Sequence, residues 1–150
     1  MNVDKFTLNA RKAVEEALED ARRRQHQYLD PDHLFLALLA QEQSIPGTLL
    51  RRLEVPLDKI RTSAEAALAR KGRVAGAFEN AVISTELARV LTAAEKFVAA
   101  FRDEYVSTEH LFLALVSEGS AAGSRALTEA GVTEEILLAA LKELRGDQRV

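Results

Sequence analysis

The chain has 150 residues, of which 47% are hydrophobic and 29% charged, and its formal net charge is −3. These values predict one globular domain and give no overall attraction to nucleic acid or to anionic membranes. The sequence has no cysteine, which excludes disulfides, thiol catalysis and Cys-ligated metal sites. Its longest apolar run, residues 34–40, is far shorter than the ~20 residues that span a bilayer. Residues 1–6 lack a signal-peptide pattern, so we expect a cytoplasmic protein.

The first predicted helix begins after Thr7, whose hydroxyl can accept a hydrogen bond from a free backbone N–H of the first turn. Apolar residues then recur with helical spacing up to Ala21. The second helix begins at Asp30-Pro31, a capping residue followed by a proline that suits the first turn. Residues 33–38 of that helix, His-Leu-Phe-Leu-Ala-Leu, are apolar on almost all sides, which predicts a place at the centre of the fold.

Two further helices are predicted from Pro46 to Leu53 and over residues 57–70. The following residues, 71–82, lack a helical period and are interpreted as a linker. The first half of the chain, residues 1–70, therefore reads as four helices.

The second half repeats the first. His-Leu-Phe-Leu-Ala-Leu recurs letter for letter at 110–115, an offset of 77, and the same offset pairs Thr7 with Ser84. We therefore predict helices after Ser84, after Ser107, over 121–130 and over 134–145, within a second repeat at 83–146. The predicted fold is all-α, one eight-helix domain over residues 1–150 built from two pseudo-symmetric four-helix repeats.

The sequence carries no evident catalytic site. It has no Gly-rich phosphate-binding motif, so we expect no nucleotide, cofactor or metal in this chain and no enzymatic activity. His33 and His110 stand at equivalent positions, three residues after the caps Asp30 and Ser107. We expect each ring to donate a hydrogen bond to its cap or to a neighbouring helix, because neither has two further ligands at metal-binding spacing.

The two repeats differ where Phe97 and Phe101 replace Asp20 and Arg24. The two rings either fill the interface between the repeats or form an exposed apolar groove that binds peptides. An acidic rim, which would contact backbone N–H groups or basic flanks of a peptide, is then expected from Asp103, Glu104 and Glu109.

A rival hypothesis is a helical nucleic-acid-binding module that uses the basic run 22–24. The sequence favours a solvated helix end instead, because no aromatic residues are interleaved with the arginines and the net charge is negative.

Three segments resemble the Clp N-terminal domain, the module that caps the AAA+ unfoldases of the Clp family. They are the Phe6-Thr7 start, residues 105–111 (Tyr-Val-Ser-Thr-Glu-His-Leu) and residues 141–146 (Leu-Lys-Glu-Leu-Arg-Gly). The last segment is most similar to the ClpB type of disaggregase. The resemblance implies a non-catalytic domain, with ATP and Mg²⁺ bound by ATPase modules elsewhere in the full-length protein.

The resemblance also implies a function. A domain of this kind recruits exposed hydrophobic segments of unfolded or aggregated proteins and passes them to its own AAA+ ring, which is hexameric in the full-length protein. The alternative within the family is a ClpC/ClpA-type protease unfoldase, in which the domain mainly docks adaptor proteins. We expect the isolated domain to be a monomer that binds neither nucleic acid nor membranes. Carried over position by position, the implied substrate-binding residues are Thr7, Asp103 and Glu109, with Phe97 and His110 at groove positions and Ala13 at the floor. His110 departs from the family, which can have leucine there. Phe101 is added to this predicted set from the comparison of the two repeats.

Overall fold

The computed structural model describes residues 3–74 and 81–146, so residues 75–80 of the predicted linker lie outside the described residues. The described chain contains eight α-helices, which confirms the all-α class. The helices are α1 (Leu8–Arg23), α2 (Pro31–Ala40), α3 (Ile45–Arg52), α4 (Leu57–Ala69), α5 (Thr85–Phe101), α6 (Thr108–Glu118), α7 (Ala122–Glu129) and α8 (Glu134–Arg145). A short 3₁₀ helix (Val3–Lys5) precedes α1, and the two-residue strands are β1 (Tyr28–Leu29) and β2 (Val82–Ile83).

The predicted capping hydroxyls lie at the helix starts. The backbone N–H of Ala10 donates to Thr7 Oγ1 at 3.2 Å, and that of Leu87 donates to Ser84 Oγ at 3.1 Å. Thr133 caps α8 in the same way. Each hydroxyl satisfies one N–H that the helix itself cannot, which fixes where the helix begins.

Helices α2 and α6 form the centre of the domain. Phe35 on α2 and Phe112 on α6 stack with their ring centroids 5.7 Å apart, and both are almost completely buried. The two residues are related by the offset of 77, so the stack joins equivalent points of the two repeats. This arrangement agrees with the pseudo-twofold relation that the repeated sequence predicts.

The repeats are also joined by two equivalent parallel strand contacts. Leu29 in β1 pairs with Ile83 in β2, and Phe6 forms a bridge with Val106. The offset of 77 converts the first pair into the second, because it relates Phe6 to Ile83 and Leu29 to Val106. Each repeat therefore holds the segment that leads into the first helix of the other. Val82 belongs to this pairing rather than to the linker predicted to end there.

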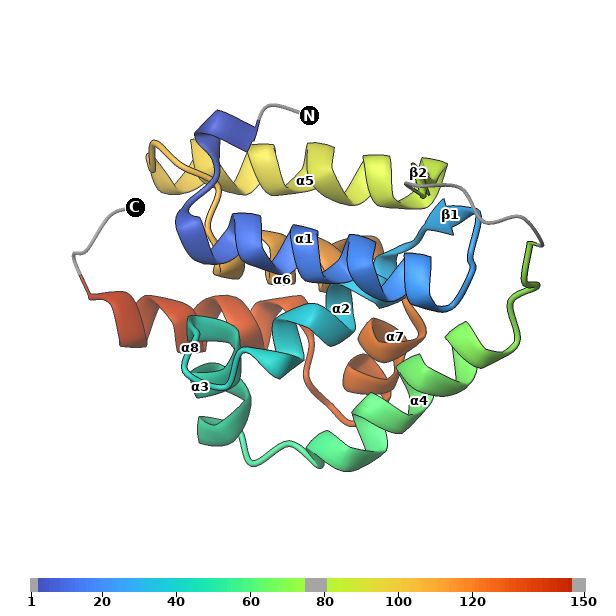
Figure 1. Cartoon of the computed structure of the whole chain (residues 1–150). Coiled ribbons are helices and arrows are strands. Elements are labelled where there is room, and N and C mark those ends of the chain that lie inside the picture. Colours follow the sequence, from blue (N-terminus) through green and yellow to red (C-terminus); the bar gives the residue numbers. More distant parts are fainter. Residues whose placement is uncertain (1–2, 75–80, 147–150) are drawn as a thin grey trace.

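Figure 1 shows α1 and α5 side by side along one face, with α3, α4, α7 and α8 on the opposite side of the central helices. In the part of the chain that the structure describes, no helix has the length and apolar character needed to cross a membrane.

Candidate functional site

The loop between α5 and α6 is held by a buried polar network. Asp103 Oδ2 lies 2.6 Å from His110 Nε2, and Asp103 Oδ1 accepts from Arg145 Nη2 at 2.6 Å. His110 Nδ1 accepts from the backbone N–H of Ser107 at 2.8 Å. Because Nδ1 is an acceptor, the ring proton of neutral His110 lies on Nε2 and is donated to Asp103. Donation to the cap, one of the two partners expected for this ring, is therefore wrong, since Nδ1 accepts there. The ring donates instead to Asp103 in the loop after α5, and not to a residue of a neighbouring helix.

The prediction of an acidic rim at the surface is wrong for Asp103 and Glu109. The side chain of Asp103 is fully buried and that of Glu109 is 5% exposed. Arg145, from the last turn of α8, supplies the cation that offsets their desolvation, and Ser107 Oγ donates to Glu109. Burial also lowers the pKa of His110, although Asp103 acts in the opposite direction. Glu104 is exposed, as expected.

Phe97 and Phe101 are half-buried and pack against each other with ring centroids 5.9 Å apart. Phe101 also packs on His110 at 5.7 Å, and the Arg145 guanidinium lies 5.4 Å from its ring centroid. These three contacts of Phe101 lie within the second repeat, among α5, α6 and α8. Both rings keep part of their surface exposed, so they are not sealed within the core, and a role in an exposed apolar groove stays a prediction.

Two other predicted site residues are also internal. Ala13 and His110 are both fully buried, so neither presents a surface to a partner in this conformation. Thr7 is partly exposed, but its hydroxyl caps α1 and its backbone N–H donates to Val106 O at 2.9 Å. The structure thus brings most of the predicted residues together, as a cluster beneath the surface.

The first repeat holds a related but neutral pair. His33 Nδ1 accepts from the backbone N–H of Asp30, and His33 Nε2 lies 2.9 Å from His26 Nδ1. Burial, with a smaller contribution from His26, lowers the pKa of His33 to about 4. Within the described residues, no group of three or more His, Asp or Glu side chains is placed to hold a metal ion.

The basic run at the end of α1 is ion-paired within the chain. Arg22 bonds Glu19 at 2.8 Å, Arg23 bonds Asp20 at 3.2 Å, and Arg24 bonds Asp20 at 2.9 Å. The run therefore presents paired guanidinium groups, which weakens the case for a nucleic-acid surface.

An apolar crevice that the sequence reasoning missed lies between the N-terminal segment, β2 and α5. It has a volume of about 240 Å³, and a smaller apolar pocket beside it shares Ile83 and Leu91. We call these two hollows together the α1/α5 crevice, because the smaller one also reaches α1 through Val14. Its larger part is lined by Phe6, Ile83, Ala88, Leu91, Thr92 and Glu95. The equivalence of Phe6 and Ile83 under the offset of 77 was the signal that could have revealed it.

These features define a class of protein: a double-repeat helical domain with an open apolar crevice and a buried polar network beside it. Comparison with known proteins identifies the family. Residues 5–130 match the family described as Clp repeat (R) N-terminal domain, and the chain belongs to that family.

Curated relatives and solved structures agree with this assignment. The chain is 32% identical over its whole length to the chaperone protein ClpB of Porphyromonas gingivalis and 35% identical to that of Nitratidesulfovibrio vulgaris. It spans only 17% and 18% of the lengths of those two relatives. The Hsp104 N-terminal domain of Candida albicans is similar in structure, with a TM-score of 0.83, 27% identity and coverage of 97% of this chain and 94% of that one. A ClpV N-domain solved in complex with a VipB peptide shares the fold, with a TM-score of 0.75, 18% identity and coverage of 97% and 90%.

Proposed function

We propose that this domain recruits substrates for a ClpB-like disaggregase by binding exposed apolar segments of unfolded or aggregated polypeptides at the α1/α5 crevice. The observation that carries the proposal is an apolar hollow open to solvent, with Ile83 36% exposed at its wall. The ClpB names of the curated relatives favour the disaggregase type over an adaptor-docking protease unfoldase. The VipB complex supports a peptide as the ligand of such a domain.

The size of the crevice implies weak binding. A hollow of about 240 Å³ accommodates one or two apolar side chains. Burial of a few hundred Å² at about 25 cal/mol per Å², less the cost of ordering the peptide, leaves micromolar to millimolar affinity. Weak binding suits a domain that must release its substrate to the ATPase ring. Six such domains on one hexamer would bind a long substrate more tightly through effective concentration.

The buried network has a positioning role in this proposal. It holds the loop whose residue Val106 accepts from the N–H of Thr7 and donates to Lys5 O at 2.7 Å, which places Phe6 at the wall of the crevice. Asp103 and His110 would then support substrate binding without touching the substrate. Direct contact by Thr7, Phe97 and Phe101 stays a prediction, because each of these residues keeps part of its surface exposed.

The test replaces Ile83 with serine and measures binding of a fluorescently labelled apolar peptide by anisotropy. Loss of about 1 kcal/mol of apolar contact weakens binding about fivefold. Ile136→Ser is the matched control, because Ile136 is 42% exposed on α8 and lies outside the crevice. Equal affinity of the Ile83→Ser variant and the unsubstituted domain would contradict the proposal. So would equal weakening by both substitutions, since binding would then depend on general surface hydrophobicity.

A further inference from the structure

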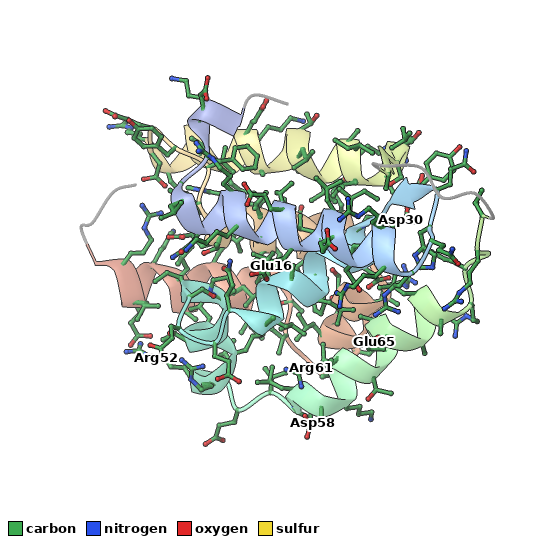
Figure 2. The ribbon with its side chains drawn as sticks, viewed as in Figure 1. Glu16, Asp30, Arg52, Asp58, Arg61 and Glu65 are labelled. Atoms are coloured by element: carbon green, nitrogen blue, oxygen red, sulfur yellow. The ribbon has the colours of Figure 1, made fainter. Side chains whose placement is uncertain are left out.

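The first repeat contains a separate cleft of about 320 Å³ between α1, α2 and α4. Helices α1 and α4 each pack against α2, and the stretch of α2 between them forms the floor. Figure 2 places Glu16 on α1 and Glu65 on α4, on either side of α2. We call this hollow the α1/α4 cleft.

The floor of the α1/α4 cleft is apolar and partly open to solvent. It is formed by Leu36, Ala37 and Ala40, and His33 of the same helix, a fully buried residue, also lines the cleft. Leu36 is only half-buried, whereas Leu113, its counterpart at the offset of 77, is 1% exposed.

The two repeats differ here because of the residues that face the floor. In the second repeat Phe97 and Phe101 stand at the positions that Asp20 and Arg24 occupy on α1. Aromatic rings fill the space between the helices, and shorter or ion-paired side chains leave it open. The exposed floor at Leu36 is therefore a feature of the first repeat that the equivalent Leu113 does not share.

The walls carry an excess of negative charge. Arg24 is neutralised by two carboxylates, since it bonds Asp20 at 2.9 Å and Glu65 at 2.7 Å. The Arg23 side chain is 68% exposed and pairs with Asp20 as well. Glu16 lies one turn before Asp20 on the same face of α1, and no ion pair involves it among the residues the structure describes. Three carboxylates thus face two guanidinium groups.

From this combination we infer that the α1/α4 cleft binds a basic side chain of a polypeptide. Arginine and lysine carry a long aliphatic stem with a charged end, which matches an apolar floor below acidic walls. The stem lies along Leu36 and Ala40, and the charged end reaches Glu16 and Glu65. An anionic group would meet the excess negative charge, and an uncharged apolar group would desolvate the carboxylates without pairing them. This site goes beyond the proposed function, because it lies outside the α1/α5 crevice and selects charge.

The test titrates the isotope-labelled domain with the peptide acetyl-Ala-Arg-Ala-Ala-amide and follows the NMR shifts. We expect shifts at Leu36, Ala37 and Ala40. The same peptide with citrulline, the uncharged isostere, should bind about threefold more weakly. Glu16→Gln should lower the affinity for the arginine peptide by a similar factor and leave the citrulline peptide unaffected. Glu15→Gln is the matched control, since Glu15 is the neighbouring exposed residue of α1 and does not line the cleft.

Three results would overturn the inference: equal affinity for the two peptides, equal weakening by Glu15→Gln, or shifts confined to the α1/α5 crevice. The peptide carries no large apolar side chain, so it reports on the α1/α4 cleft independently of the crevice. Repeating the titration with Ile83→Ser separates the two proposals, because that substitution should leave binding of the arginine peptide unchanged.

Discussion

His33 and His110 occupy the same position in the two repeats and are both fully buried, yet their rings meet different partners. His33 lies 2.9 Å from His26, and both rings have lowered pKa values because burial disfavours the charged form. His110 lies 2.6 Å from Asp103, which also binds Arg145. Both histidines accept at Nδ1 from the backbone N–H of the residue that precedes their helix, so the change from a neutral to a charged partner lies at the second nitrogen.

The comparison of the two histidines indicates that the buried Asp103 and the distant Arg145 form one unit. The offset of 77 relates Asp103 to His26 and Arg145 to Leu68, which is fully buried and apolar. In the first repeat the last turn of the fourth helix carries Leu68, and the partner of His33 is the neutral His26. In the second repeat the equivalent turn carries Arg145, and the partner of His110 is the carboxylate of Asp103, because a buried charge requires a counter-charge.

The largest expected effect comes from breaking this unit. Asp103→Ala removes the acceptor of the His110 N–H and leaves Arg145 with only the longer ion pair to Glu109 at 3.9 Å, which should lower the free energy of unfolding by about 3–5 kcal/mol. Urea denaturation followed by circular dichroism measures the change. Asp58→Ala, at a side chain that is fully exposed to solvent, is the control and should leave the stability almost unchanged.

A double substitution tests whether Asp103 and Arg145 act together. Asp103→His combined with Arg145→Leu gives the second repeat the partners of the first, and should cost less than the sum of the two single substitutions. Additive costs would show that the two residues act separately.

The second prediction concerns the pH dependence of the first repeat. The pKa of His33 is about 4 in the folded protein, against 6.5 for an unperturbed histidine. As the pH falls below 6.5 the unfolded chain takes up the proton first, so stability declines and levels off below about pH 4. The loss from His33 amounts to at most about 3 kcal/mol. Urea midpoints measured from pH 7 to pH 4 give the profile.

A variant in which residue 33 cannot titrate isolates the contribution of His33 to the pH dependence of stability. His33→Gln keeps an acceptor for the backbone N–H of Asp30, since glutamine is a common residue at this capping position. Its stability should fall less steeply with decreasing pH. His26 and His110, whose pKa values are also lowered, contribute to the remaining slope, and Asp32, whose pKa is raised by burial, opposes them. Identical slopes for the two proteins would contradict the assignment to His33.

The helices of this domain could be predicted because their signals are local. The stripes of small apolar residues and the caps Thr7 and Ser84 act within one or two turns, and both hydroxyls accept the expected hydrogen bond. The repeat could be predicted for the same reason, because one stretch of sequence recurs at a constant offset. The β1–β2 pairing could not be predicted, because strands of two residues carry no alternating pattern.

The interior of the candidate site could not be predicted because its partners are remote. Asp103 follows a helix in a loop, where a carboxylate is normally exposed, and its cation comes from 42 residues further along the chain. Phe97 and Phe101 were identified correctly as the difference between the repeats. The first repeat has Asp20 and Arg24 at these positions in place of the rings, and there the α1/α4 cleft stays open.

The smallest predicted effect tests the packing around the pseudo-twofold contact. A Cβ added at Gly123 would lie 2.3 Å from the ring of Phe35. The backbone N–H of Gly123 donates to Asp32 Oδ1 at 3.1 Å, and this hydrogen bond restrains the start of α7. Gly123→Ala should therefore lower stability by about 1 kcal/mol, because overpacking exceeds the gain in helix propensity. Gly72→Ala, where nothing lies within 4 Å, should cost nothing.

Phe35→Leu provides the decisive second step for this position. A smaller side chain at 35 leaves room for the new methyl group, so Gly123→Ala should become neutral or stabilising in that background. Thermal or urea unfolding of the four proteins in this cycle gives the coupling. If Gly123→Ala costs the same with either residue at 35, the strain lies in the backbone of α7 and the ring does not set it. The first repeat has Pro46 at the equivalent position, so a positive coupling would show that the core differs between the repeats even where the Phe35–Phe112 stack is symmetric.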